Sequence, residues 1–339
     1  MKAYKIGAQA GLESLALADV PDPVAGPGEV VVRVNAVCLN HRDLLILSGS
    51  YGPRKPEGRI PASDGIGEVI GFGAGVSGVS IGDRVTAPHF ASWLDGAFSP
   101  AIFAADLGVS CNGWLAEQIV LPAAAVVKVA DTLSDEQIVP LPAAGVTAWH
   151  ALVEVGRVKA GDLVLALGTG GVSILALQIA KLKGARVAIT SSGDEKLSLA
   201  RQLGADITIN YRTHPDWAAA LMEATGGGGA DIIVETGGQA TLGQSLAAAA
   251  PNGRIAVIGA LAGVPSQGLA NFQAIIGKNL TIKGITSGSR AMLADLIHAV
   301  ELGGMQPVID KVYSFDDAPA AYAYLKTGAH MGKIMIRVC

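Results

Sequence analysis

The feature that most constrains the fold is a glycine-rich turn that joins two apolar segments in the middle of the chain. Residues 163–167 read Leu-Val-Leu-Ala-Leu, the pattern of a strand buried on both faces. A Gly-Thr-Gly-Gly turn at 168–171 follows, and residues 172–183 have helical length and an apolar composition. Strand, tight turn and buried helix open a parallel βαβ unit, so the chain is predicted to contain an α/β domain.

The turn also has the spacing of a dinucleotide-binding fingerprint. Gly168 permits the tight turn, Gly170 lets the backbone approach a pyrophosphate, and the helix start offers free N–H groups to the anion. Ser173 stands where the fingerprint has its third glycine, and it is small enough for close helix–strand packing. The glycine spacing alone is a weak signal, and the alternative is a turn that binds no nucleotide.

After this turn, strands and helices alternate, and both kinds of segment are defined by their apolar periodicity. Strands are predicted at 163–167, 186–191, 207–210, 231–235, 254–259 and 280–285, and helices at 172–183, 195–203, 217–224 and 242–249. Six strands in this alternation predict a doubly wound Rossmann sheet.

The first ~125 residues are β-rich instead, because short β-branched runs are punctuated by Gly, Pro and Asp. Predicted strands lie at 30–37, 67–72 and 119–121, and residues 82–85 form a turn that leads into a further strand. The tail is predicted to form a helix at 292–302, a loop, a helix at 317–325 and a strand at 333–338. Its apolar faces need a partner, and a return to the amino-terminal domain would supply one. The expected division is 1–127 with 289–339 as one domain and 128–288 as the other.

The end of the second Rossmann strand bears on which dinucleotide is bound. NAD-preferring sites place a carboxylate there for the ribose 2′-hydroxyl, whereas this chain has Ser191 and Ser192 and reaches its first acid at Asp194. Hydroxyls can donate to a 2′-phosphate, Lys196 can add a positive charge, and Tyr211 can add a further donor. We therefore expect NADP(H) to be favoured over NAD(H). The alternative for Lys196 is an ordinary solvated helix residue.

Composition excludes several other classes of partner. The net charge is −4 and no run of Lys or Arg appears, so neither nucleic acid nor an anionic membrane is expected as a partner. The apolar stretch 163–180 contains glycines that interrupt a membrane helix. Cys38, Cys111 and Cys339 form no CxxC pair, and the amino terminus shows no signal-peptide core, so a cytoplasmic location is expected.

Motifs along nearly the whole chain resemble those of the medium-chain dehydrogenase/reductase superfamily, in its zinc-free quinone-oxidoreductase-like branch. They are Pro-Gly-Glu-Val at 27–30, Cys-Leu-Asn-His-Arg-Asp at 38–43, Asp-Gly-Ile-Gly-Glu-Val at 64–69, Gly-Asp-Arg-Val at 82–85, Ala-Ala-Gly-Val-Thr-Ala-Trp at 143–149 and Gly-Lys-Ile at 332–334. The resemblance implies a GroES-like, partly open β-barrel catalytic domain beside the Rossmann domain, with the active site between them.

Departures from the zinc-dependent relatives concern the metal ligands. Those relatives have a ligand Cys where this chain has Asn40, and Gly-His-Glu where it has Ala-Ser-Asp at 62–64. Catalytic zinc needs three ligands of Cys, His or carboxylate type, and only Asp64 qualifies among these positions. The four-cysteine lobe of such relatives is also missing, because Cys111 stands alone. We expect no zinc.

The glycine turn, the end of the second Rossmann strand and the resemblance together give the predicted site residues. The predicted cofactor-binding residues are Asn40, Thr147, Gly168, Thr169, Gly170, Gly171, Val172, Ser191, Ser192, Lys196, Tyr211, Thr236, Gly259, Ala260, Arg290 and Lys333. For catalysis, Asn40 is predicted to face the nicotinamide ribose and substrate, and His41 with Asp64 or Asp43 to shuttle protons. Alternatives stay open: His41 as a packed or surface residue, Arg42 and Asp43 as a structural ion pair, and Arg290 as an interdomain salt bridge. His89, Phe90, Trp93 and Trp114 are either an aromatic wall over the substrate or core filling.

Three functions are compatible with this sequence. The favoured one is NADPH-linked reduction of a quinone or a conjugated carbonyl compound, the second is metal-free interconversion of an alcohol and a ketone, and the third is a nucleotide-binding sensor or structural protein without turnover. The last Rossmann strand, near 280–285, would leave an open sheet edge. Since relatives pair this edge, a homodimer is expected.

Overall fold

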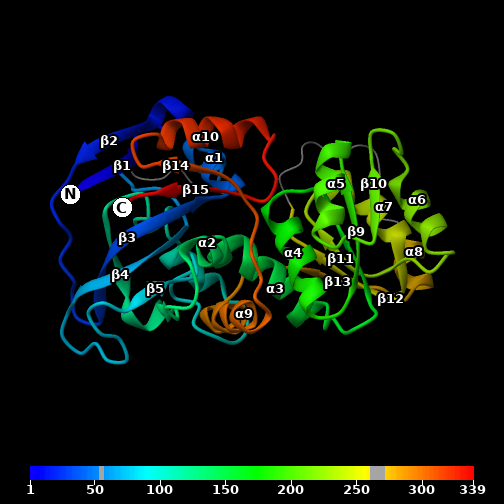
Figure 1. Cartoon of the computed structure of the whole chain (residues 1–339), viewed down its shortest axis with the longest axis horizontal. Helices are drawn as coiled ribbons and strands as arrows, with labels where there is room; N and C mark the ends of the chain where they lie inside the picture. The colour runs from blue at the N-terminus through cyan, green and yellow to red at the C-terminus, as the bar shows by residue number, and fades with distance from the viewer. Residues whose placement is uncertain (53–56, 260–271) are drawn as a thin grey trace. The chain divides into compact units, whose positions relative to one another are not determined.

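The computed structural model describes residues 1–52, 57–259 and 272–339, which form two compact units (Figure 1). Unit 1 comprises 1–146 and 288–339, and unit 2 comprises 147–287. Residues 128–146, which we expected in the Rossmann domain, therefore belong to unit 1. They are largely buried and apolar, so their sequence pattern would suit the core of either unit.

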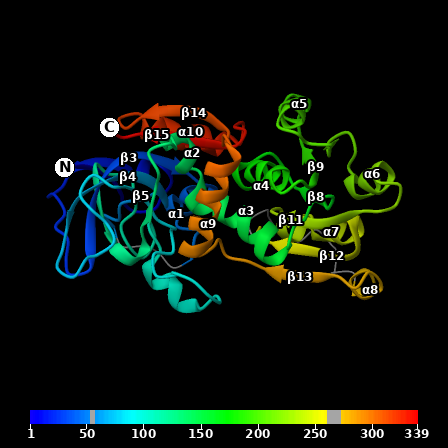
Figure 2. The same cartoon turned by 60° about the horizontal axis from the view of Figure 1, so that its bottom comes forward.

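Unit 2 is built on a six-stranded sheet, counted over the described residues, in which every strand pair is parallel. The strand order β10-β9-β8-β11-β12-β13 is that of a doubly wound Rossmann fold, as predicted. Figure 2 shows β11, β12 and β13 side by side. The strands are β8 Leu163–Ala166, β9 Arg186–Ser191, β10 Ile207–Asn210, β11 Ala230–Glu235, β12 Ala249–Val257 and β13 Thr281–Gly284.

Helices join these strands and start at recognisable signals. Helix α5 begins with two acidic residues in its first turn, and α6 is capped by Asp216, whose carboxylate accepts from the Ala219 N–H. The helical segments are α3 Val146–Trp149, which begins at the last residue of unit 1, η5 His150–Val155, α4 Gly171–Leu182, α5 Asp194–Gln202, α6 Trp217–Ala224, η6 Gly238–Ala240, α7 Leu242–Ala248 and α8 Phe272–Gly277. Leu165, Ile233 and Ile255 belong to the core of this unit.

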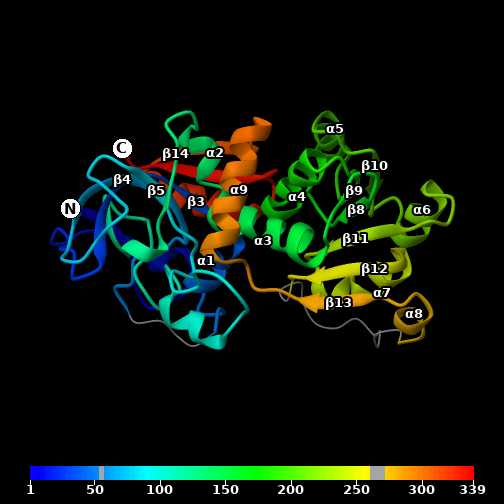
Figure 3. The same ribbon diagram turned by 90° about the horizontal axis from the view of Figure 1, so that it is seen from below.

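Unit 1 contains a seven-stranded sheet over the described residues, ordered β14-β15-β3-β4-β5-β7, with β6 paired to β3. Figure 3 shows β3, β4 and β5 next to one another. A separate two-stranded sheet pairs β1 with β2. The strands are β1 Lys2–Ile6, β2 Leu15–Asp19, β3 Glu29–Leu39, β4 Asp64–Phe72, β5 Arg84–Thr86, β6 Gln118–Pro122, β7 Val127–Lys128, β14 Ile309–Ser314 and β15 Lys333–Arg337.

The tail returns to the amino-terminal part of the chain, as expected, because β15 pairs antiparallel with β3. Helix α10 packs against α1 and β15. Left-handed glycines, Gly304 and Gly328, end α9 and α10. The helical segments of unit 1 are η1 Leu12–Ser14, α1 His41–Leu47, η2 Pro100–Ala105, η3 Ala123–Ala125, α2 Asp135–Ile138, η4 Leu141–Gly145, α9 Arg290–Gly303 and α10 Ala318–Thr327.

One expectation for the tail is wrong. The loop predicted between its two helices contains β14, which pairs in parallel with β15. Its residues are half-buried or exposed throughout, so the sequence lacks the apolar alternation that marks a strand.

Within the described part of the chain, one helical stretch is long and apolar enough to span a membrane by length and composition. It runs over Asp135–Val155, and 89% of its most apolar window is buried inside the protein. Burial of this kind is typical of a core helix.

Candidate functional site

The glycine turn of unit 2 has the geometry that an anion site requires. Gly168 has φ 76°, a conformation that L side chains rarely adopt, and Gly170 is the N-cap of α4. No side chain caps this helix start, and a Cβ built on Gly168 or Gly170 meets no atom within 4 Å. The first N–H groups of α4 therefore have no capping side chain, and no acidic residue lies in the first turn. The turn fits a dinucleotide pyrophosphate.

Hydroxyl groups hold this turn in place. Ser173 Oγ donates to the Leu167 carbonyl at 2.6 Å, and Thr236 Oγ1 donates to the same oxygen at 2.9 Å. The Gly168 N–H donates to Thr190 Oγ1 at 3.1 Å. Ser173 thus occupies the third fingerprint position with a bond of its own, so this departure from glycine stabilises the turn.

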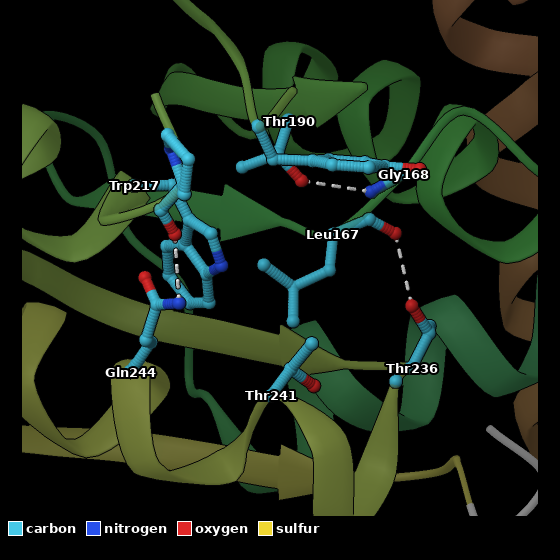
Figure 4. Close-up of a pocket in the computed structure, with 10 residues that line it drawn as sticks. Leu167, Gly168, Thr190, Trp217, Thr236, Thr241 and Gln244 are labelled. Carbon is cyan, nitrogen blue, oxygen red and sulfur yellow. Dashed lines mark hydrogen bonds between the residues drawn. The ribbon is translucent and has the colours of Figure 1, made fainter. Parts of the chain in front are cut away.

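A pocket of about 370 Å³ opens beside the turn, at the carboxyl ends of the strands (Figure 4). Gly168, Tyr211 and Thr236, which the sequence predicted as cofactor contacts, lie in its wall. The pocket is lined by Leu167, Gly168, Thr190, Tyr211, Pro215, Trp217, Thr236, Gly237, Thr241 and Gln244. Gln244 Nε2 donates to the Pro215 carbonyl at 3.0 Å, and its Oε1 accepts from the Ala218 N–H at 3.1 Å, so this wall is fixed. A flat, mostly apolar ring of a nucleotide base suits such a pocket.

A buried carboxylate at a strand end organises one side of the pocket. Glu235, at the end of β11, is fully buried. Its Oε1 accepts from the N–H groups of Gly237 and Gly238 at 2.8 and 2.9 Å and from Thr241 Oγ1 at 2.6 Å, while Oε2 accepts from Ser245 Oγ. Four donors satisfy this charge and fix the Gly237–Thr241 loop. An acid directly after an apolar strand and before Thr-Gly-Gly was the available sequence signal.

Gly259 follows β12 beside Thr236. A Cβ at this position would lie 1.9 Å from the Thr236 carbonyl oxygen, so a glycine is required there. The predicted contact Ala260 lies outside the described residues.

The end of β9 places hydroxyls where a carboxylate would otherwise stand. Ser191 is buried, and its Oγ lies 3.4 Å from Thr169 Oγ1. Ser192 and Lys196 are half-buried, and Tyr211 is exposed. The nearest acid in sequence, Asp194, accepts from Asn210 Nδ2 at 2.8 Å.

The remaining predicted residues of unit 2 lie at helix starts. Thr147 is buried, whereas Gly171 and Val172 are half-buried in the first turn of α4.

In unit 1, three predicted residues form one polar cluster, in which Asp64 and Lys333 are buried and Asn40 is half-buried. Lys333 Nζ donates to Asn40 Oδ1 at 2.5 Å and to the Leu39 carbonyl at 2.7 Å, and it lies 3.5 Å from Asp64 Oδ2. Asn40 Nδ2 donates to the same Asp64 oxygen at 3.0 Å. Asp64 is fully buried, and burial raises its pKa, although the charge of Lys333 opposes this.

This donor set does not fit tetrahedral zinc. Both ends of the Asn40 amide are engaged, and the Lys333 ammonium already supplies a positive charge beside Asp64. Among the described residues, no group of three His, Cys, Asp or Glu side chains is arranged to hold a metal ion.

The other residues considered for catalysis are placed differently. The side chain of His41 is exposed at the first position of α1. Asp43 is buried and accepts from the Asn40 N–H at 2.7 Å, and burial raises its pKa to about 7. Arg290 starts α9 and donates through Nε to the Val126 carbonyl at 3.0 Å.

The suggested ion pair of Arg42 with Asp43 is replaced by another. Arg42 Nη2 binds both carboxylate oxygens of Asp106, at 2.7 and 2.6 Å, and Nη1 lies 2.5 Å from His89 Nδ1. All three residues are buried. Of the four suggested wall aromatics, Trp114 packs in the main core of unit 1, whereas Phe90 and Trp93 form a smaller cluster with Ile102.

Two protein families match this chain. Residues 26–131 match the alcohol dehydrogenase GroES-like domain, and residues 171–301 match zinc-binding dehydrogenase. A zinc-type alcohol dehydrogenase-like protein of Schizosaccharomyces pombe is 42% identical over 94% of this chain and 93% of its own length.

Solved structures show the same fold over the whole length. An NAD-dependent alcohol dehydrogenase is 35% identical with a TM-score of 0.90, covering 100% of both chains. A mycobacterial protein complexed with NADPH is 28% identical with a TM-score of 0.82, again covering 100% of both. The chain therefore belongs to the medium-chain dehydrogenase/reductase superfamily of NAD(P)-dependent oxidoreductases, with a GroES-like domain and a Rossmann-type domain.

Proposed function

We propose that the protein is an NADP(H)-dependent reductase of small conjugated carbonyl compounds or quinones that works without catalytic zinc. The observation that carries this proposal is the polar cluster of Asn40, Asp64 and Lys333. A divalent cation beside Asp64 would meet the Lys333 ammonium at short range, and like charges in a buried site repel strongly. The chain therefore supplies polar groups to its substrate without a Lewis acid.

The choice of NADP(H) rests on the end of β9. Ser191 and Ser192 offer hydroxyls there, and the carboxylate of Asp194 is held by Asn210. Lys196 on α5 supplies a positive charge, and Tyr211 supplies a phenol in the wall of the pocket. The two solved relatives differ in this respect, one being named NAD-dependent and the other complexed with NADPH. This chain's own residues favour the phosphorylated form.

Within this proposal, the residues divide the work. When bound, the reduced nicotinamide supplies a hydride. The α4 amides hold the pyrophosphate, and the loop fixed by Glu235 holds the base. Asp64 is fully buried and accepts from Asn40 Nδ2, so it orients the Asn40 amide. Lys333 keeps Asn40 and Asp64 in place.

A second candidate is interconversion of an alcohol and a ketone, again without metal. It is favoured by the names of two relatives described above, the alcohol dehydrogenase-like protein that is 42% identical to this chain and the alcohol dehydrogenase that is 35% identical.

One set of assays separates these functions. NADPH oxidation is followed with 2-cyclohexen-1-one and 1,4-benzoquinone, with the enzyme-free rate subtracted, and NADP⁺ reduction is followed with a panel of primary and secondary alcohols. We expect turnover with the first two probes, no effect of EDTA, and no zinc by elemental analysis. Turnover confined to alcohols would favour the second candidate. Binding of NADPH without any turnover would indicate a sensor, and one zinc per chain would refute the metal-free mechanism.

Cofactor preference has its own test. Calorimetry should give a lower Kd for NADPH than for NADH, and K196A should remove most of this difference. Lys181 lies in the last turn of α4 and pairs with Asp206, and it provides the matched control, K181A. Equal affinity for the two cofactors in the wild type would refute the preference.

We also propose that the protein is a cytoplasmic homodimer. Strand β13 ends the order of the Rossmann sheet and is exposed along its length, and Ile282 presents an apolar side chain there. Such an edge is commonly covered by a second copy. The free state of Cys38, Cys111 and Cys339 suits a reducing compartment.

A further inference from the structure

A buried network in unit 1 joins three charged or titratable side chains from distant parts of the sequence. Arg42 comes from α1, His89 follows β5, and Asp106 follows η2. Arg42 binds both oxygens of Asp106 through Nη2 and approaches His89 Nδ1 through Nη1 at 2.5 Å. The Arg42 guanidinium also lies over the Tyr51 ring, 4.8 Å from its centroid. Arg42 is thus held from several sides.

This arrangement fixes the protonation state of His89. A guanidinium group can only donate, so His89 Nδ1 must accept, and the ring proton must sit on Nε2. Nδ1 also lies 3.1 Å from Asp106 Oδ1, but the shorter contact is to Arg42, and a proton on Nδ1 would be directed at a cation. Burial lowers the pKa of His89, the charge of Arg42 lowers it further, and Asp106 and Asp64 oppose the shift. The imidazole is therefore held neutral.

The other nitrogen of the ring is left available. His89 Nε2 has no hydrogen-bond partner among the described residues. Arg42 Nε and Asp64 Oδ1 are also unpartnered in the described chain, but these two atoms are fully occluded, whereas His89 Nε2 is not. A donor that is buried in an ordered network, yet neither paired nor sealed, is positioned to meet an acceptor that is not part of the chain.

We infer that His89 is a catalytic hydrogen-bond donor, whose Nε2–H stabilises the negative oxygen that forms on a carbonyl substrate, and that Arg42 and Asp106 are positioning residues that fix its tautomer. This inference rests on the proposed carbonyl reduction. A neutral imidazole can act as an electrophile in this way when its environment keeps it from protonating.

The step balances as follows. For an enone, the hydride adds to the β-carbon, the electron pair of the C=C bond moves to form an enolate, and the charge collects on the carbonyl oxygen beside His89 Nε2–H. The ring keeps its proton, and water protonates the α-carbon to give the saturated ketone. Donors aimed at a developing oxyanion in a dry site typically contribute about 10²–10³-fold in kcat.

The first test concerns the tautomer and needs no turnover. The chain has six histidines, so ¹⁵N-histidine labelling gives few signals, and the one missing from an H89N variant identifies His89. In the NADPH-bound wild type, Nδ1 should be the unprotonated nitrogen, and the ring should protonate only below its ordinary pKa. A His89 that protonates near its ordinary pKa, or that carries its proton on Nδ1, overturns the inference.

The second test concerns the role of Nε2 and uses two matched variants. In H89N, the amide oxygen can still accept from Arg42, but the distal donor is lost. In H89Q, an amide N–H reaches the position of Nε2. With 2-cyclohexen-1-one and NADPH, H89N should lose about 10²–10³-fold in kcat. H89Q should stay within about tenfold of the wild type, and neither variant should change the Kd for NADPH. Equal kcat for H89N and the wild type overturns the inference.

A third variant reports on Arg42 as a positioning residue. In R42M, His89 Nδ1–H can bond to Asp106, so a new ionisation between pH 6 and 8 should appear in the pH profile of kcat. A merely structural loss would lower kcat equally at every pH, and that outcome overturns the assignment of Arg42. If the wild type itself reduced neither enone nor quinone, the proposed function would fail, whereas wild-type turnover with an unaffected H89N would refute only the role of His89.

Discussion

Replacing Lys333 with methionine tests the electrostatics of the polar cluster. The substitution keeps much of the side-chain volume but leaves Asp64 without the ammonium that lies 3.5 Å away. Removing one partner of a buried ion pair costs about 3–5 kcal/mol, because the other charge stays buried and unpaired. For a domain of this size, each kcal/mol lowers Tm by about 2–4 °C. We therefore expect the Tm of K333M to fall by roughly 6–20 °C at pH 8.

The loss should depend on pH with a definite sign. Burial already raises the pKa of Asp64 in the folded protein, and without Lys333 it rises further. Between the unfolded pKa and this raised folded pKa, the folded state binds more protons than the unfolded state, so stability falls as pH rises. The slope reaches at most about 1.4 kcal/mol per pH unit for a single group. K333M should therefore be closest to the wild type near pH 5.

Urea unfolding at pH 5, 6, 7 and 8 measures this dependence, with D64N/K333M as the control. The double variant has no carboxylate to titrate at this site, so its loss should not grow with pH. A loss below about 1 kcal/mol at pH 8 would refute the reasoning, and so would a K333M pH profile identical to that of the double variant.

Three further predictions follow from unit 2. E235A should destabilise the protein by about 3 kcal/mol or more in urea unfolding and raise the Kd for NADPH, because four donors lose their acceptor. E235Q should cost about 1–2 kcal/mol, and equal effects of the two variants would contradict this. G259A should lower the free energy of unfolding by about 1–3 kcal/mol and weaken dinucleotide binding, because the new Cβ meets a carbonyl oxygen. The control is G277A, where a Cβ meets nothing within 4 Å, and it should leave binding unchanged. I282K should convert the proposed dimer to monomer in size-exclusion chromatography with light scattering, and a dimer that persists would rule out the β13 edge.

The Rossmann sheet could be predicted strand by strand because its signals are local, although β12 begins at Ala249, five residues before its predicted start. Each buried strand is a short apolar run, and each following helix has its own periodicity, so β9, β10 and α6 have the predicted bounds. Strand β14 could not be found in this way, since its side chains are half-buried or exposed and its partner β15 lies about twenty residues further along. The predicted boundary between the two units was misplaced because nothing in the sequence of residues 128–146 indicates which core these residues join.

The candidate site, too, could be predicted only where its sequence signals are local. The turn glycines and the hydroxyls of β9 could be predicted as cofactor contacts because each stands next to a strand end, and the structure places them at the start of α4 and the end of β9. The Arg42–His89–Asp106 network was not found, although His89 was noted, because its contacts join residues 47 and 64 positions apart. Side chains at that separation are brought together only by the tertiary fold.

The discontinuity of unit 1 has a consequence for synthesis on the ribosome. Unit 2 is one continuous segment, whereas the sheet of unit 1 needs β15 to pair with β3 across nearly 300 residues of chain. Because domains generally fold as they emerge, the nucleotide-binding half can form while β3 still has an unpaired edge. Nascent chains arrested after residue 287 should therefore resist protease in the second half of their sequence before the first half becomes protected.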